Sequence, residues 1–329
     1  MRRATGILMC ACLAGLPSIA AAETHWDLQA TDSMGASTWS GSHPFVLTGT
    51  ILNNPEDMLD ATANFVPWDG GAGQGQMGGE WQLFIQADET GDRGGTALWM
   101  GQNYGNLPWN HSSDLGYSNT AWEEEMLRLN YDPDTGHRFR QGDRVTVTAN
   151  YSAFYGGKRN VNEGHSKDTG MNFSVTLLEA GAGLPEPESI DLTDLLADTS
   201  GAGYDPNFPM FDASRQTGAE HYQGVYVHLS NLLMDDSSGW GGTAWGERLC
   251  TVKDEAGNLL NLRMPLYDLG EVPTGSFDAF GIINQESGMA EDGRFGYELF
   301  VMQITPEPAS ALLLITGVLG WVGARRRNK

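Results

Sequence analysis

Histidine, serine and cysteine occur in this sequence without the spacings that catalysis or zinc binding requires. The seven histidines form no His-Glu-x-x-His pair and no Cys/His arrangement with zinc-ligand spacing. His221 and His228 are seven residues apart, so on one strand their side chains would point to opposite faces. There is no Gly-x-Ser-x-Gly elbow and no phosphate-binding loop. The pattern therefore gives no support to a serine or cysteine nucleophile or to a histidine-based site.

Carboxylates are abundant, with 42 Asp and Glu against 19 Lys and Arg. Two carboxylates can hydrolyse a glycosidic bond, so a paired-carboxylate glycosidase stays open, although no two positions stand out. Asp132 and Asp134 precede Gly136, and residues 88–92 hold three more carboxylates, which together suit Ca²⁺. Asp-Pro-Asp-x-Gly is first a turn motif, however, and neither loop has the distal glutamate of a calcium loop. We expect no cofactor, with calcium as the alternative interpretation.

Two tryptophans form the most suggestive binding feature. Trp240 and Trp245 flank Gly-Gly-Thr-Ala in a loop rich in glycine and serine. Indole rings on such a loop can stack on sugar faces, which makes both residues candidates for ligand stacking. The competing and favoured interpretation is that the rings fold back and cover a hydrophobic core.

The C-terminus has the pattern of a short membrane-spanning helix. Residues 309–324 carry no charge, and Arg325, Arg326 and Arg327 follow them. Sixteen helical residues extend roughly 24 Å, slightly less than the roughly 30 Å hydrocarbon core of a bilayer. The arginines favour the cytoplasmic side, so the preceding chain is expected to face outward. The inner triplet Pro185-Glu186-Pro187 precedes acidic residues instead and predicts an extended linker.

The N-terminus has the three parts of a secretory signal peptide. Arg2 and Arg3 precede a short apolar run, and Ala20–Ala22 supply small residues before Glu23. Residues 1–22 are therefore predicted to be a removed signal peptide, with a retained anchor helix as the alternative. Cys10 and Cys12 lie in this segment, so Cys250 is alone in the exported part and is expected to be a buried, unreactive side chain.

Pro306, Glu307 and Pro308, followed by the apolar segment and the arginine cluster, resemble the PEP-CTERM sorting signal of bacterial exosortase substrates. The resemblance covers residues 305–329 and implies a membrane-embedded, exosortase-type processing enzyme as partner. It implies export, temporary anchoring through the C-terminal helix, and a final place at the cell surface or in the extracellular polysaccharide matrix. A plain C-terminal membrane anchor is the alternative.

The charge balance excludes one class of partner. The formal net charge is −23, and six basic residues lie in the two terminal segments, which makes the remaining chain more acidic still. Nucleic acid binding depends on clustered Lys and Arg that displace counterions from phosphates, so we expect no nucleic acid partner.

Short alternating apolar runs between Gly, Asp and Asn turns predict an all-β protein with two small domains. Short helices are expected only at Ser189–Asp198 and Thr120–Leu127. The predicted division is: signal peptide 1–22, N-terminal extension 23–42, first β domain 43–180, acidic Pro/Gly linker 181–203, second β domain 204–304, and sorting signal 305–329. The predicted strands are Phe45–Leu52, Trp81–Ala87, Ala97–Gly101, Arg144–Tyr151, Asn172–Leu178, Tyr222–Leu229, Arg248–Lys253, Leu259–Met264, Phe277–Ile283 and Tyr297–Gln303.

The two halves show the same order of elements. Each begins with a strand near a glycine, Gly49 or Gly224, and continues with a hairpin, a glycine-led strand and a closing strand. This order suggests a duplicated five-stranded barrel. The second half in particular resembles OB-fold-like domains of secreted bacterial proteins, with a β-sandwich as the alternative.

Three functions follow in order of preference. The first is a non-enzymatic structural or adhesive protein of the surface or matrix, the second is a carbohydrate-binding module protein for exopolysaccharide, and the third is a secreted hydrolase.

Overall fold

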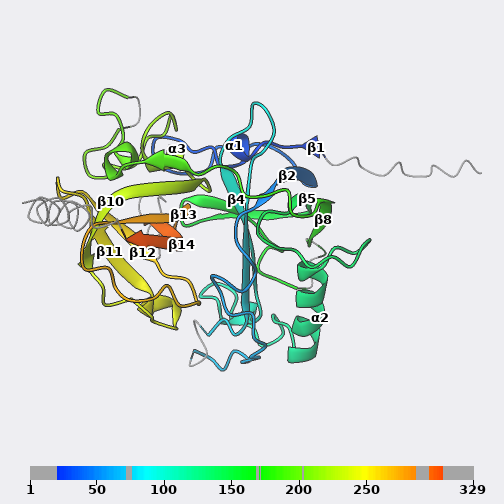
Figure 1. Cartoon of the computed structure of the whole chain (residues 1–329). Coiled ribbons are helices and arrows are strands. Elements are labelled where there is room, and N and C mark those ends of the chain that lie inside the picture. Colours follow the sequence, from blue (N-terminus) through cyan, green and yellow to red (C-terminus); the bar gives the residue numbers. More distant parts are fainter. Residues whose placement is uncertain are drawn as a thin grey trace, which may run out of the picture.

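The chain folds into a mostly β structure with two sheets and few helices in the computed structural model (Figure 1). The structure describes residues 21–71, 76–167, 170, 172–201, 204–286 and 296–306. Within these ranges, each of the ten predicted strands overlaps an observed strand; most ends differ by three residues or fewer, but the strand predicted at Tyr222–Leu229 is found at Tyr226–Asp236. The prediction of a mostly β fold is therefore confirmed.

The first sheet has the order β6-β7-β4-β3-β2-β5-β8, and β1 pairs with β2 in parallel. Its central pairs, β2 with β3 and β5, β3 with β4, and β5 with β8, are antiparallel. The strands are β1 (Ala21–Ala22), β2 (Phe45–Ile51), β3 (Glu80–Gln86), β4 (Gly95–Gly101), β5 (Arg144–Ala149), β6 (Ser152–Tyr155), β7 (Lys158–Val161) and β8 (Phe173–Glu179).

The second sheet closes on itself. Its order is β11-β12-β14-β13-β10-β9, and an additional pairing of β10 with β11 completes a ring of five strands. Within the ring, β12 and β14 are parallel and the other pairs are antiparallel. The strands are β9 (Glu188–Ile190), β10 (Tyr226–Asp236), β11 (Leu249–Lys253), β12 (Leu259–Arg263), β13 (Phe277–Gln285) and β14 (Tyr297–Pro306).

The expected duplication holds for the order of the strands but not for barrel closure. In the second half, β12 pairs with β14 and closes the ring, whereas its counterpart β4 pairs with β7. The hairpin β6–β7, which the sequence pattern did not predict, adds to the edge of the first sheet instead. Within the described part of the first half, the strand pairings thus form an open path.

The main helix, α2 (Asn119–Asn130), matches the expected helix at Thr120–Leu127. Ser118 caps its N-terminus by accepting a hydrogen bond from the Ala121 amide, and Trp122, Met126 and Leu129 form its buried stripe. The other helical elements are single turns: α1 (His25–Leu28), α3 (Gly218–His221), η1 (Tyr104–Asn106), η2 (Leu192–Leu195) and η3 (Trp245–Glu247).

The segment predicted as linker is part of the second sheet. Glu188–Ile190 form β9, which pairs in parallel with β10, so the helix expected at Ser189–Asp198 is replaced by a strand and the single turn η2. Ile190, Leu192 and Leu195 bury their side chains in the core of the second half. Three apolar side chains in this otherwise acidic stretch explain why it packs instead of remaining extended.

Each half has its own core, and a third cluster joins them. In the first half, Trp81, Leu83 and Ile85 alternate along β3 and point into the core with α2. The joining cluster contains Phe84 from the opposite face of β3, together with Phe300 of β14, whose ring centroid lies 5.4 Å from that of Phe84. The two halves, which lie side by side in Figure 1, therefore pack through the buried apolar side chains of this cluster.

Backbone contacts complete this interface. The amide of Gly95 donates to the carbonyl of Gln223 at 3.0 Å, and a Cβ on Gly224 would lie 2.6 Å from Gly95. Gly224 also has a positive φ of 72°, a region that side chains other than glycine rarely adopt. Both glycines are needed for this close approach.

The predicted terminal segments fall at or beyond the edges of the described ranges. Ala21 and Ala22 of the predicted signal peptide pair with β2 as β1, while residues 1–20 lie outside. At the other end β14 runs to Pro306, so the second domain extends past the predicted boundary at residue 304. The predicted helix 309–324 also lies outside, and no helix within the described ranges is both long and apolar enough to cross a bilayer.

Candidate binding pocket

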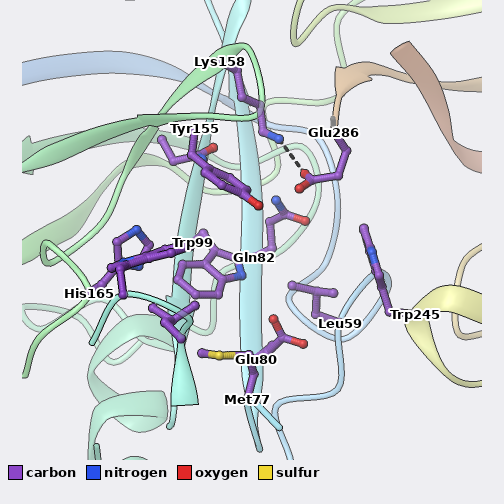
Figure 2. A pocket seen from close by; sticks show the side chains of 13 residues that line it. Leu59, Met77, Glu80, Gln82, Trp99, Tyr155, Lys158, His165, Trp245 and Glu286 are labelled. Atoms are coloured by element: carbon purple, nitrogen blue, oxygen red, sulfur yellow. Dashed lines mark hydrogen bonds and ion pairs between the residues drawn. The ribbon is translucent and has the colours of Figure 1, made fainter. Parts of the chain in front are cut away.

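A cavity of about 300 Å³ opens where the first sheet meets the second half (Figure 2). Its wall comes from β3, β4, the hairpin β6–β7 and loops of the first half, with Trp245 and Glu286 contributed by the second half. The lining residues are Leu59, Met77, Glu80, Gln82, Trp99, Leu107, Trp109, Tyr155, Lys158, Asn160, His165, Trp245 and Glu286.

The alternation of β3 decides which side chains reach this cavity. Trp81 and Leu83 enter the core of the first half, so Glu80 and Gln82 point from the opposite face. Gln82 pairs with Trp99 of β4, which places an amide and an indole side by side on the pocket wall. The strand that supplies core residues therefore also positions the polar groups of the pocket.

Aromatic rings form a large part of the wall. The ring centroid of His165 lies 5.5 Å from that of Trp99 and 5.8 Å from that of Trp109, which in turn lies 5.9 Å from that of Tyr155. Trp109 is 53% exposed and Tyr155 is 43% exposed, so both rings present apolar surface to solvent beside the opening. Burial lowers the pKa of His165 to about 4, which keeps its imidazole neutral.

Trp245 is fixed from behind by two arginines. The Arg263 guanidinium lies 4.1 Å from its ring centroid and the Arg248 guanidinium lies 5.4 Å away. Arg263 pairs with the buried carboxylate of Glu298 at 2.9 Å, and Arg248 donates to the carbonyl of Met58 at 2.6 Å. These contacts hold the indole in place at the pocket wall.

Two carboxylates share the pocket. Glu286 accepts a hydrogen bond from the Lys158 ammonium at 2.7 Å, and the same ammonium donates to the carbonyl of Gln285 at 2.6 Å. Burial raises the pKa of Glu80 to about 7, and the charge of Glu286 adds to this rise. Figure 2 shows both carboxylates at the cavity, with the Gln82 amide between them.

The pocket contains buried polar atoms without partners. Gln82 is 4% exposed and Asn160 is 9% exposed, and the side-chain oxygen of each has no hydrogen bond within the described structure. The Nδ1 atom of His165 also lacks a partner there. A buried polar atom without a hydrogen bond is costly, so these atoms are suited to a polar ligand.

The two tryptophans considered as stacking candidates both pack against apolar clusters, which was the favoured interpretation. Trp240 packs against the core of the second half and donates from Nε1 to the carbonyl of Gly270 at 2.8 Å. Trp245 packs against the cluster that joins the halves, with its ring centroid 5.9 Å from that of Phe300, and it also lines the pocket. Of the predicted sorting residues, Pro306 ends β14, while Glu307, Pro308, Arg325, Arg326 and Arg327 lie outside the described residues.

The loops considered for calcium use their carboxylates in other contacts. Asp132 accepts from the amides of Thr135 and Leu177, and Asp92 accepts from the amides of His25 and Trp26. Across the described ranges, no group of three His, Cys, Asp or Glu residues could hold a metal ion.

The expectation for the remaining cysteine is confirmed. Cys250 is fully buried, and burial raises the pKa of its thiol to about 11. At this pKa the thiol stays protonated at neutral pH and is a poor nucleophile.

Sequence reasoning missed most of the pocket. Lys158 and Glu286 are 128 positions apart, and no local pattern relates them. One signal was available: Gln82 alternates with core residues on the predicted strand Trp81–Ala87, and Glu80 precedes that strand in the same alternation.

Comparison with known proteins adds no relative, because no protein-family model and no curated protein sequence matches the chain. The pocket is consequently the feature from which a function is argued.

Proposed function

We propose that this chain is an exported adhesive protein of the cell surface or extracellular matrix that binds carbohydrate in the pocket between its halves. Its role is non-enzymatic, and the ligand is part of an extracellular polysaccharide. This proposal unites the structural or adhesive function with carbohydrate binding, since a pocket for polysaccharide is a means of adhesion.

The observation that carries the proposal is the pairing of aromatic rings with unpartnered amide oxygens in one cavity. Trp99, Trp109 and Trp245 offer flat apolar surfaces that match the C–H faces of a sugar ring. The side-chain oxygens of Gln82 and Asn160 can accept hydrogen bonds from sugar hydroxyls. A volume of about 300 Å³ lies at the lower end of the range typical of small-molecule sites.

The topology of the second half supports the same ligand class. A five-stranded ring with a parallel β12–β14 pair is what an OB-fold would form, and OB-folds bind oligosaccharides through the loops between strands 1 and 2 and strands 4 and 5. Trp245 lies between β10 and β11, the first two strands of the ring, and Glu286 directly follows β13, the fourth. These are the corresponding loops.

The terminal sequences support the proposed route. The signal peptide 1–22 would direct export, and the PEP-CTERM-like segment 305–329 would anchor the chain through helix 309–324 until an exosortase-type enzyme processes it. The acidic charge keeps such a protein soluble once released. No nucleic acid partner is proposed.

Carbohydrate binding can be tested with the purified full-length chain in detergent. Tryptophan fluorescence and calorimetry would follow titration with oligosaccharides and with the exopolysaccharide of the producing organism. Replacing Trp245 by alanine should weaken binding about tenfold, because stacking of one ring on a sugar contributes on the order of 1–2 kcal/mol. Trp240→Ala is the matched control and should leave affinity unchanged. Absence of binding to every saccharide would refute the proposal.

A secreted hydrolase is the second candidate because Glu80 and Glu286 share the pocket. With a pKa of about 7, Glu80 can be protonated near neutral pH and could donate its proton to the leaving glycosidic oxygen. The Glu286 carboxylate would then take a proton from the attacking water. Release of reducing ends by the wild type, and its loss in Glu80→Gln with binding retained, would favour this candidate.

A further inference from the structure

We propose that the pocket selects an amino sugar, whose ammonium group lies between the carboxylates of Glu80 and Glu286. This inference rests on the proposed carbohydrate binding and specifies the class of sugar. A polymer or oligomer of glucosamine units with free amino groups is the ligand that the chemistry fits.

The charges that line the pocket are unbalanced. Two carboxylates, Glu80 and Glu286, face one cation, Lys158. The Lys158 ammonium is already occupied by Glu286 and by the carbonyl of Gln285, and its side chain is 2% exposed. Among the described residues of the cavity, this leaves the Glu80 carboxylate without a cation of its own when it is ionised, although the Trp99 side chain hydrogen-bonds it.

The nearby arginines correct this balance only in part. Arg263 is paired with Glu298, whereas Arg248 donates to the carbonyls of Met58 and Met264 and its charge lowers the pKa of Glu80. Both guanidiniums contact the Trp245 ring, and neither residue lines the cavity. Among the described residues that line the cavity, an anionic sugar such as a uronic acid would therefore meet two carboxylates and one paired cation, which disfavours its binding.

The unpartnered atoms indicate a hydrogen-bond donor as ligand. Among the described residues that line the cavity, the buried amide atoms without partners are the oxygens of Gln82 and Asn160, and both amides are more than nine-tenths buried. An ammonium group has three donors and no acceptor, so it can satisfy such oxygens together with a carboxylate. Aromatic rings add to this selectivity because their faces attract cations.

Protonation of Glu80 gives the binding a defined pH dependence. Burial raises the pKa of Glu80 to about 7, with Glu286 raising it further and Arg248 opposing the rise. Below that pH the carboxyl is protonated and loses its attraction for an ammonium. Affinity for an amino sugar should consequently pass through a maximum with pH, because Glu80 loses its charge below its pKa and the sugar ammonium loses its charge above its own, while affinity for a neutral sugar should show no such maximum.

The test compares β-1,4-linked tetrasaccharides of glucosamine, N-acetylglucosamine and glucose, titrated into the full-length chain in detergent at pH 7. Glucosamine oligomers should bind about tenfold or more tightly than the other two, as expected for a matched charge pair. Glu80→Gln and Glu286→Gln should each reduce this preference, measured as the ratio of the affinities for the glucosamine and glucose oligomers. Glu247→Gln, an exposed residue beside Trp245, is the matched control.

The outcomes separate the two proposals. If the glucose or acetylated oligomer binds as tightly as the glucosamine oligomer, amino-sugar selection is wrong while carbohydrate binding stands. If the glucosamine preference survives in both glutamine variants, the assignment to these carboxylates is also wrong. If no oligomer binds to a chain whose folding is verified by circular dichroism, both proposals fail.

Discussion

Glu220 offers a direct measurement of how a buried carboxyl affects stability. It belongs to α3, it is 1% exposed, and its Oε1 accepts a hydrogen bond from the Tyr297 hydroxyl at 2.6 Å. Its second oxygen, Oε2, is buried without a hydrogen-bond partner in the described structure. Burial raises the pKa of Glu220 to about 7, although Tyr297 and Arg215 oppose the rise. The perturbation is Glu220→Gln, which keeps the shape and removes the ionisation.

The size and sign of the effect follow from linkage. The pKa of Glu220 is about 7 in the folded chain against a reference value of 4.5, and each pKa unit corresponds to about 1.4 kcal/mol. Because the folded pKa is the higher one, the stabilising contribution is complete below pH 4.5 and is lost as the pH rises through 7. The carboxyl therefore costs the wild type about 3 kcal/mol of unfolding free energy at pH 8 relative to pH 4.5.

Urea unfolding of wild type and Glu220→Gln at pH 4.5 and pH 8 measures this difference. The variant should be close to the wild type at pH 4.5 and more stable than it by about 3 kcal/mol at pH 8. Groups common to both proteins cancel in the comparison. Glu255→Gln, in an exposed turn, controls for the loss of one negative charge. A stability difference between variant and wild type that is the same at both pH values would refute the assignment of a raised pKa to Glu220.

Three further predictions concern the interface and the tail. Phe84→Ala should lower the unfolding free energy by about 3–5 kcal/mol, measured by urea denaturation, because it opens a cavity beside Phe300 between the halves. Gly95→Ala should cost about 1–3 kcal/mol in the same assay, because the new Cβ would lie 2.2 Å from the Gly224 carbonyl oxygen; a neutral effect would contradict the close approach. Removal of residues 309–329 should move the expressed protein from the membrane fraction to the medium or periplasm, as measured by fractionation and immunoblotting.

Local sequence patterns were sufficient for most strands because their alternation is strong. In Arg144–Ala149, the buried residues Val145, Val147 and Ala149 alternate with Arg144, Thr146 and Thr148 on the other face. This is the pattern of a half-buried strand. The strand Lys158–Val161 was not predicted, because Lys-Arg-Asn-Val has no apolar alternation. It is held by pairing with β4 and β6 and by the contacts of its buried lysine with residues of the second half, all of which are tertiary.

The pocket was less accessible to sequence reasoning for a related reason. Trp245 could be singled out by residue type and loop context, but the same criteria selected Trp240; both rings cover apolar clusters, and only Trp245 also lines the pocket. What separates them is the position of the first sheet, which no local signal contains. Closure of the second ring through β12 and β14 also depends on a non-local parallel pairing, and the absence of the equivalent pairing in the first half could not be foreseen.

The last strand of the barrel has a mechanical consequence. β14 runs between β12 and β13, and its final residue, Pro306, still lies opposite Phe277 in the ladder. The β13 ladder follows this strand from Tyr297 to Pro306, while β12 pairs with it only at Glu298–Phe300. A force along the strand, applied beyond Pro306, would act perpendicular to the hydrogen bonds of the β13 ladder and load them together in shear, so the second half would resist tension at its C-terminal end.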